Sequence, residues 1–169
     1  MRSEAGLPYH AGPMALFLTW TTYGSWLPGD DRGWCDVHGV MRQPSHRLAL
    51  HASRFMRDAR VELGQHDRGI VEAAVREHCE FRGWQLHAVN CRPAHVHVVV
   101  SAWGWSPGEV LRSIKARCSR NLSSRAGGRA RWWTRNGSKR LLYDTRDVED
   151  VVAYVLECQD RPRAETRRS

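Results

Sequence analysis

Two histidines separated by a single residue form the pattern in this chain with the clearest chemical potential. They are His95 and His97, and they lie in an apolar stretch that runs from Pro93 to Ser101. Successive side chains of a β-strand point to opposite faces, so both imidazoles would share one face and the alternating valines would share the other. Residues one pleat apart lie roughly 7 Å from each other at the backbone, so both rings could reach one metal ion. The alternative is an exposed sheet face that happens to carry two histidines.

Length and composition point to one cytosolic domain with an anionic partner. The chain has 169 residues, with 26 Lys and Arg against 18 Asp and Glu and a net charge of +8. That excess favours a polyanion, of which nucleic acid is the commonest. The five cysteines are scattered without a Cys-x-x-Cys pair, which predicts reduced thiols in a cytosolic protein. The apolar run at 14–18 is too short to cross a membrane, so we expect no membrane partner.

The order of the expected elements predicts an α+β fold. We expect strands at 15–23, 84–91 and 93–101, helices at 46–62, 67–82, 106–126 and 144–159, and a hairpin at 131–143. This order matches a ferredoxin-like split βαβ antiparallel sheet with helices on one face, plus the β-hairpin and a C-terminal helix. We assign 1–14 to a flexible leader, 15–160 to a single domain with an insert at 24–62, and 161–169 to a basic tail.

Local patterns predict how these elements pack. Leu16, Leu18 and Trp20 alternate toward the core, which leaves Thr19 and Thr21 on the open face near the histidines. The helix at 46–62 is expected to turn Leu48, Phe55 and Met56 inward. In the insert, Trp26 and Trp34 are expected to cover a sheet edge rather than to stack on bases. Asn136-Gly137 predicts a type I′ turn between two hairpin strands.

The last helix carries a tyrosine outside its apolar stripe. The stripe consists of Val148, Val151, Val152, Val155 and Leu156. At 100° per residue, Tyr154 falls well away from these side chains. We therefore expect its hydroxyl to point outward, while a half-buried structural tyrosine is the alternative.

The preceding helix carries several basic residues, and their shared positive charge favours contact with phosphates over a merely solvated face. With two arginines of the hairpin, the expected DNA-binding residues are Arg112, Lys115, Arg117, Arg120, Arg131 and Arg135.

Three groups of residues together resemble the HUH-type tyrosine transposases, above all the short insertion-sequence class and its REP-associated relatives. The resemblance covers about residues 15–160. The motifs that carry it are Leu18-Thr19-Trp20-Thr21-Thr22-Tyr23-Gly24 with Trp26-Leu27-Pro28-Gly29 and Arg32-Gly33-Trp34, then Cys91-Arg92-Pro93-Ala94-His95-Val96-His97, and Tyr154-Val155-Leu156-Glu157-Cys158-Gln159.

The resemblance implies a metal-dependent enzyme that cleaves and rejoins single-stranded or hairpin DNA through a 5′-phosphotyrosine. Tyr154 would be the nucleophile, and the other tyrosines lie in a leader or at strand ends. His95 and His97 would hold Mg²⁺ or Mn²⁺, although imidazole alone would favour zinc or another transition metal. The family's third ligand, Gln or Asn, comes four residues after the tyrosine, where this chain has a cysteine. Gln159 comes one residue later, and Glu157 is the fallback ligand.

Two other functions stay open at this point. One is a non-catalytic module that binds single-stranded nucleic acid on the same sheet. The other is an HUH nickase for replication or plasmid transfer. The resemblance implies a cytoplasmic, nucleoid-associated protein, and a monomer and a homodimer are equally compatible with the sequence.

Overall fold

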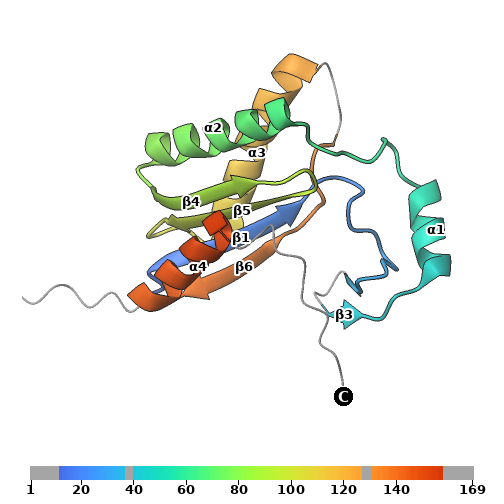
Figure 1. Cartoon of the computed structure of the whole chain (residues 1–169), viewed down its shortest axis with the longest axis horizontal. Coiled ribbons are helices and arrows are strands. Elements are labelled where there is room, and N and C mark those ends of the chain that lie inside the picture. Colours follow the sequence, from blue (N-terminus) through green and yellow to red (C-terminus); the bar gives the residue numbers. More distant parts are fainter. Residues whose placement is uncertain (1–11, 37–39, 127–130, 158–169) are drawn as a thin grey trace, which may run out of the picture.

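The computed structural model describes residues 12–36, 40–126 and 131–157, and a four-stranded antiparallel sheet lies at its centre (Figure 1). The strand order is β4-β5-β1-β6. The strands are β1 (Ala15–Thr21), β4 (Gln85–Cys91), β5 (His95–Ser101) and β6 (Ser138–Leu142). The helices are α1 (His46–Arg54), α2 (Gln65–Arg82), α3 (Pro107–Ala126) and α4 (Thr145–Glu157). This arrangement confirms the predicted α+β, ferredoxin-like fold. The predicted tail and most of the predicted leader lie outside the described residues.

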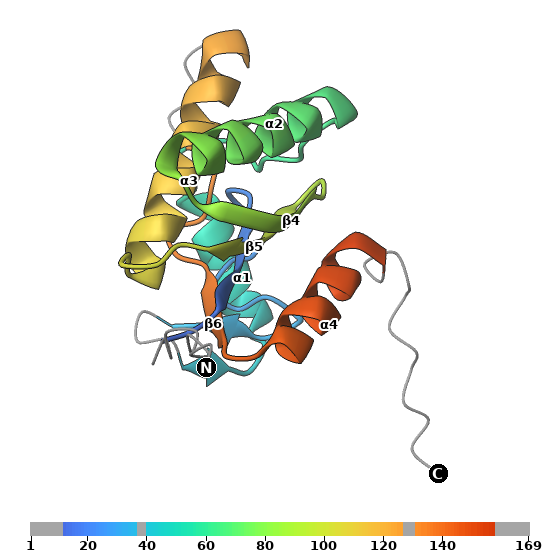
Figure 2. The ribbon, with the colours of Figure 1, turned by 90° about the vertical axis from the view of Figure 1, so that its left-hand side faces the viewer.

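The sheet separates two layers of helices (Figure 2). Helices α2 and α3 lie together on one side of it, and α4 lies on the other. The first side holds the larger core, in which the alternate valines of β5 and the alternate apolar residues of β1 are buried, as the sequence predicts. These side chains are Leu16, Leu18, Trp20, Val96, Val98 and Val100.

A smaller core holds α4 on the opposite side of the sheet. Val151 and Val155 of the helix are buried there against Val99 of β5. The side-chain amide of Asn90, on β4, donates to the carbonyl of Val155 at 3.0 Å. Apolar burial and one hydrogen bond therefore fix the part of α4 that carries the tyrosine.

Helix boundaries follow the local signals. The backbone of Gly83, with φ of 66°, adopts the left-handed conformation that ends α2. Before α3, Ser106 Oγ accepts from the Glu109 N–H at 3.3 Å while the Glu109 carboxylate accepts from the Ser106 N–H at 3.0 Å. This reciprocal pair is the predicted capping box. In the described parts of the chain, no helix combines the length and apolarity that crossing a membrane requires.

The insert between β1 and α2 differs from its prediction. Helix α1 ends at Arg54, no residue of it is buried, and Phe55 is 72% exposed. Figure 1 shows α1 standing apart from the sheet, so its apolar residues have no sheet to pack against. Leu48 and Met56 instead lie against glycines of the preceding loop, Gly29 and Gly24. The predicted helix at 46–62, with its inward Phe55, is therefore wrong beyond the first turns.

The expected role of the insert tryptophans also changes. The indole of Trp26 donates to the carbonyl of Gly33 at 2.6 Å and thereby closes its own loop. Trp34 begins the two-residue strand β2 (Trp34–Cys35), which pairs with β3 (Met41–Arg42) in a separate small sheet. These contacts stabilise the insert itself rather than an edge of the main sheet.

The predicted hairpin at 131–143 does not form. β6 pairs with β1, and the residues before β6 are hydrogen-bonded to α3 and to the end of β1 instead. A type I′ turn needs positive φ at both central residues, and neither Asn136 nor Gly137 has it. The reason is burial of two indoles: Trp132 donates to the hydroxyl of Ser123 at 2.8 Å, and Trp133 to the carbonyl of Lys115 at 3.3 Å. Packing on α3 therefore outweighs the local turn signal.

Candidate active site

The two histidines lie side by side on the sheet face opposite α2 and α3, as the alternation of β5 predicts. Their ring centroids are 4.8 Å apart and the ring planes are nearly perpendicular, at 80°. His97 is buried, whereas His95, at the start of β5, is half-buried. Two imidazoles at this separation can share a small ligand between them.

A threonine on the neighbouring strand fixes the His97 ring. Thr19 lies directly opposite His97 in the β1–β5 ladder, and its Oγ1 is 2.9 Å from His97 Nδ1. Thr21 lies opposite His95, but its hydroxyl pairs with that of Thr134 at 2.9 Å. Of the two threonines expected near the site, one therefore contacts a histidine and the other ties β1 to the segment before β6.

Tyr154 completes the cluster from α4. Its ring lies edge-on to His97, with centroids 6.3 Å apart and an interplanar angle of 84°. The ring of Phe17, on β1, stacks on the His97 ring, with centroids 5.7 Å apart and nearly parallel planes at 17°. Tyr154 is 47% exposed, so its phenol is held against the buried histidine and is still open to a ligand. Four residues from three elements thus converge: Phe17, Thr19, His97 and Tyr154.

Burial keeps both imidazoles neutral. It lowers the pKa of His97 to about 4, with smaller contributions from His95 and Arg92. Burial likewise lowers the pKa of His95, and the positive charges of Arg92 and Arg32 lower it further. A neutral imidazole is the form that donates a lone pair to a metal ion. The donor pair therefore fits a divalent cation.

The described residues offer two candidate metal donors, His95 and His97, and no complete ligand set. Within the ranges that the structure covers, no three His, Cys, Asp or Glu side chains are grouped so that they could hold a metal. Glu157 is exposed and forms no such group with the histidines, and Gln159 lies outside the described residues. The rest of a coordination shell would thus be open to Gln159, to water or to oxygen atoms of a substrate.

The expected DNA-binding residues do not converge on the histidines. Those on α3 belong to the helix layer on the far side of the sheet (Figure 2). The ammonium of Lys115 donates to the backbone carbonyls of Thr134 at 2.7 Å and Asn136 at 3.1 Å. Arg117 forms an ion pair with Glu77 at 3.2 Å. These two side chains therefore hold the fold together as well as adding positive charge.

The other expected basic residues are more open. Arg112, Arg120 and Arg135 are exposed, and the guanidinium of Arg131 lies 6.0 Å from the centre of the Tyr23 ring.

Phe17 is the site residue that the sequence prediction missed. Its signal was present, because strand alternation places Phe17 on the same face as Thr19.

The fold and site define an α+β protein with a histidine pair and a helix-borne tyrosine on one face of an antiparallel sheet. No family model matches the sequence, and no curated protein matches it. Among solved structures, a REP-associated tyrosine transposase bound to a REP hairpin is similar to it. The TM-score is 0.48 over 90% of this chain and 70% of that one, with 14% identity.

A candidate transposase from Deinococcus radiodurans is similar with a TM-score of 0.47, over 92% of this chain and 95% of that one, at 13% identity. At such TM-scores and identities the likeness concerns the course of the chain alone. What this chain does is therefore inferred from its own residues.

Proposed function

We propose that this chain cleaves and rejoins single-stranded DNA, with Tyr154 as the nucleophile, in the manner of an HUH-type tyrosine transposase. The observation that supports this most is the position of the Tyr154 phenol, edge-on to His97 and beside a pair of neutral imidazoles. The His95-Val96-His97 and Tyr154-to-Gln159 motifs add to it, because the same residues carry the resemblance to that family.

The reaction transfers a phosphoryl group from one ester oxygen to another. The Tyr154 phenolic oxygen attacks the phosphorus atom, a new bond forms between them, and the bond from phosphorus to the 3′ oxygen breaks. The phenolic proton ends on the departing oxygen, which leaves a 5′-phosphotyrosine and a free 3′-OH. Because the covalent bond is kept as an ester, another 3′-OH can reverse the step and rejoin the strands without an external energy source.

His95 and His97 would hold a divalent metal, Mg²⁺ or Mn²⁺, with Gln159, water or oxygen atoms of the substrate as further ligands. When bound, such an ion polarises a phosphoryl oxygen and stabilises the charge that develops there.

The protein's own contribution is orientation. Thr19 contacts the His97 ring at Nδ1, and the Phe17 ring stacks on it. α4 is anchored by the buried Val151 and Val155. Misplacement of a nucleophile by about 1 Å can cost on the order of 100-fold in rate, so this anchoring matters for attack.

The test is to trap the covalent intermediate. The protein is incubated with a single-stranded DNA hairpin and Mn²⁺, and adducts are resolved on a denaturing gel and mapped by mass spectrometry. Tyr154→Phe should abolish the adduct while fold and DNA binding persist. Tyr143→Phe is the matched control, because Tyr143 is also exposed but follows β6 and makes no ring contact with His97 among the described residues.

An adduct that survives in Tyr154→Phe, or that maps to Tyr143, would show the assignment to be wrong. DNA binding without any adduct in the unaltered protein would favour a non-catalytic binding module. Cleavage without rejoining to a second strand would favour a nickase.

A further inference from the structure

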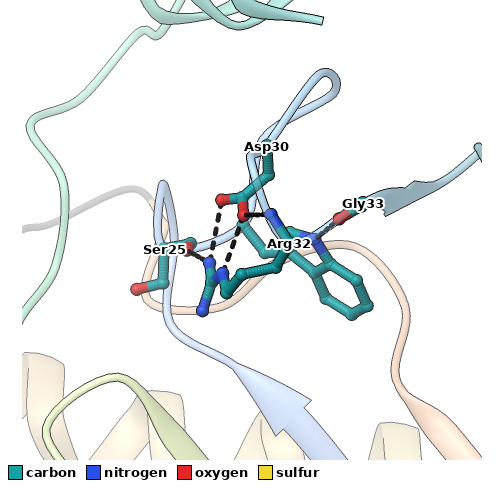
Figure 3. A network of polar contacts seen from close by, with 5 residues as sticks. Ser25, Asp30, Arg32 and Gly33 are labelled. Atoms are coloured by element: carbon teal, nitrogen blue, oxygen red, sulfur yellow. Dashed lines mark hydrogen bonds and ion pairs between the residues drawn. The ribbon is translucent and has the colours of Figure 1, made fainter. Parts of the chain in front are cut away.

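An arginine in the loop after β1 is held in a fixed orientation (Figure 3). The Asp30 carboxylate accepts from Arg32 Nε at 2.7 Å and from Arg32 Nη2 at 2.8 Å. Nη2 also donates to the backbone carbonyl of Ser25 at 2.7 Å. Three hydrogen bonds from two nitrogen atoms therefore fix the plane of the guanidinium, in a side chain that is still 68% exposed.

The loop that carries this ion pair is itself rigid. Gly29 has φ of 90° and approaches α1 so closely that a Cβ there would lie 2.5 Å from the backbone nitrogen of Ala49. The N–H of Ser45 donates to the Gly29 carbonyl at 2.9 Å, and the Trp26 indole closes the loop on Gly33. Asp30 therefore stands on a turn that cannot shift without displacing α1, and the orientation of Arg32 follows from it.

The same loop is bonded to the strand that carries the histidines. Ser25, whose carbonyl accepts from Arg32, also forms a side-chain contact. Its hydroxyl is hydrogen-bonded to the hydroxyl of Thr22. The N–H of Thr22 donates to the carbonyl of Ala94 at 2.9 Å, and Ala94 directly precedes His95. Arg32 is thus connected to the start of β5, where His95 lies, through a short series of hydrogen bonds.

The chemistry left open on Arg32 is that of an anion ligand. Asp30 and Ser25 engage Nε and Nη2, and no described residue accepts a hydrogen bond from Nη1. An exposed ion pair contributes little to stability by itself. A guanidinium that is pre-oriented loses less conformational freedom when it binds, and its donor geometry matches phosphate.

We propose that Arg32 binds a phosphate of the DNA strand next to the one that Tyr154 attacks, and that Asp30 orients it for this contact. The proposal rests on the proposed function, because the strand is taken to lie across the histidine pair. It assigns a positioning role at the substrate to an ion pair that would otherwise only close a loop.

The test compares two arginines of the same insert that each pair with an aspartate. Arg42, on β3, bonds to Asp36 at 2.8 Å and its side chain is 55% exposed, so Arg42→Gln removes the same charge and the same kind of pair. DNA binding is measured as a function of salt in a Tyr154→Phe background, so that no covalent chemistry contributes. Arg32→Gln should weaken binding at low salt by about tenfold and reduce the salt slope by about 0.7. Arg42→Gln should change neither appreciably.

A second arm identifies the phosphate. Neutral methylphosphonates replace single phosphates along the strand. At one position the replacement should weaken binding by the protein in which Arg32 is unchanged, but should cause no further loss in Arg32→Gln. Arg32→Lys keeps the charge and serves if the glutamine variant fails to fold, since one ammonium cannot satisfy Asp30, Ser25 and a phosphate together. Binding by Arg32→Lys should be weakened less by the methylphosphonate at that same position than binding by the unaltered protein.

An unchanged salt slope in Arg32→Gln, equal losses in the two glutamine variants, or no phosphate that distinguishes Arg32 from Lys would each overturn the proposal. These results would leave a Tyr154 adduct untouched. Conversely, failure to form an adduct would leave the binding result standing, so the two proposals fail separately.

Discussion

At the scale of single residues, the His97 ring is oriented by a hydrogen bond to Thr19 and by stacking on Phe17. Its pKa of about 4 keeps it neutral, so only one ring nitrogen carries a proton. If His97 is to bind a metal through Nε2, the proton must sit on Nδ1 and be donated to Thr19 Oγ1, which lies 2.9 Å away. Thr19 would therefore select the tautomer as well as the orientation.

Replacing this threonine tests that role. Thr19→Val removes the hydroxyl but keeps the β-branched shape, so the strand should still form. Loss of such an outer hydrogen bond typically costs about 10–100-fold, and we expect a decrease of that size in the rate of adduct formation. The measurement is the time course of the phosphotyrosine adduct at fixed Mn²⁺ concentration. Thr21→Val is the matched control, because its hydroxyl bonds to Thr134 instead, and equal losses in both variants would contradict the role.

At the scale of elements, one lysine joins α3 to the segment that replaces the predicted hairpin. Lys115 donates to the carbonyls of Thr134 and Asn136, and Thr134 in turn is bonded to the carbonyl of Thr21 at 3.0 Å. α3, the segment before β6 and the end of β1 thus form one connected unit. This unit sets where β1 ends, close to the partner of His95.

The stability of this unit should depend on pH. Burial, with a contribution from Lys139, lowers the pKa of Lys115 to about 8, below its ordinary value of 10.5. Between these values the unfolded chain binds more protons at Lys115 than the folded chain does, so the contribution to stability rises with pH. Urea unfolding at about pH 7.5 and about pH 9.5 should show this protein gaining stability relative to Lys115→Met. A stability difference that is independent of pH, or that falls as pH rises, would contradict this.

The elements also show what sequence could predict. The faces of β1 and β5 follow from alternation within a single strand, so the side on which His95 and His97 lie could be predicted from the sequence. The pairing of strands across the sheet was harder to predict. Asn136-Gly137 is a strong local turn signal, but the burial of Trp132 against α3 overrides it. Similarly, the amphipathic pattern of α1 is real but meets no core, because its neighbours are the glycines of its own insert. Pairings that depend on distant segments leave no local trace.

At the scale of the whole molecule, the two helix layers have different tasks. α2 and α3 cover the larger core, and α4 presents the tyrosine on the other face (Figure 2). Three cysteines lie within the larger core and report on whether it is intact. They are Cys79, Cys91 and Cys118, all buried free thiols.

These thiols should be almost unreactive in the folded protein. Burial raises the pKa of Cys79 and of Cys91 to about 12, and it raises the pKa of Cys118 well above its ordinary value. Because the thiolate is the nucleophile, alkylation by iodoacetamide near pH 8 should be at least about 100-fold slower than in urea. Peptide mapping by mass spectrometry measures each site. Rapid labelling of any of the three without denaturant would show that this core opens readily.

The position of β1 in the sheet has a consequence for how the protein is made. β1 spans Ala15–Thr21, yet its two neighbours in the sheet are β5, at His95–Ser101, and β6, at Ser138–Leu142. During synthesis β1 emerges before both of these strands and stays without either partner until β5 has been translated. Such long-range pairing slows folding and exposes an unpaired apolar strand to aggregation. The contact between Thr19 and His97 can therefore form only after translation has passed β5.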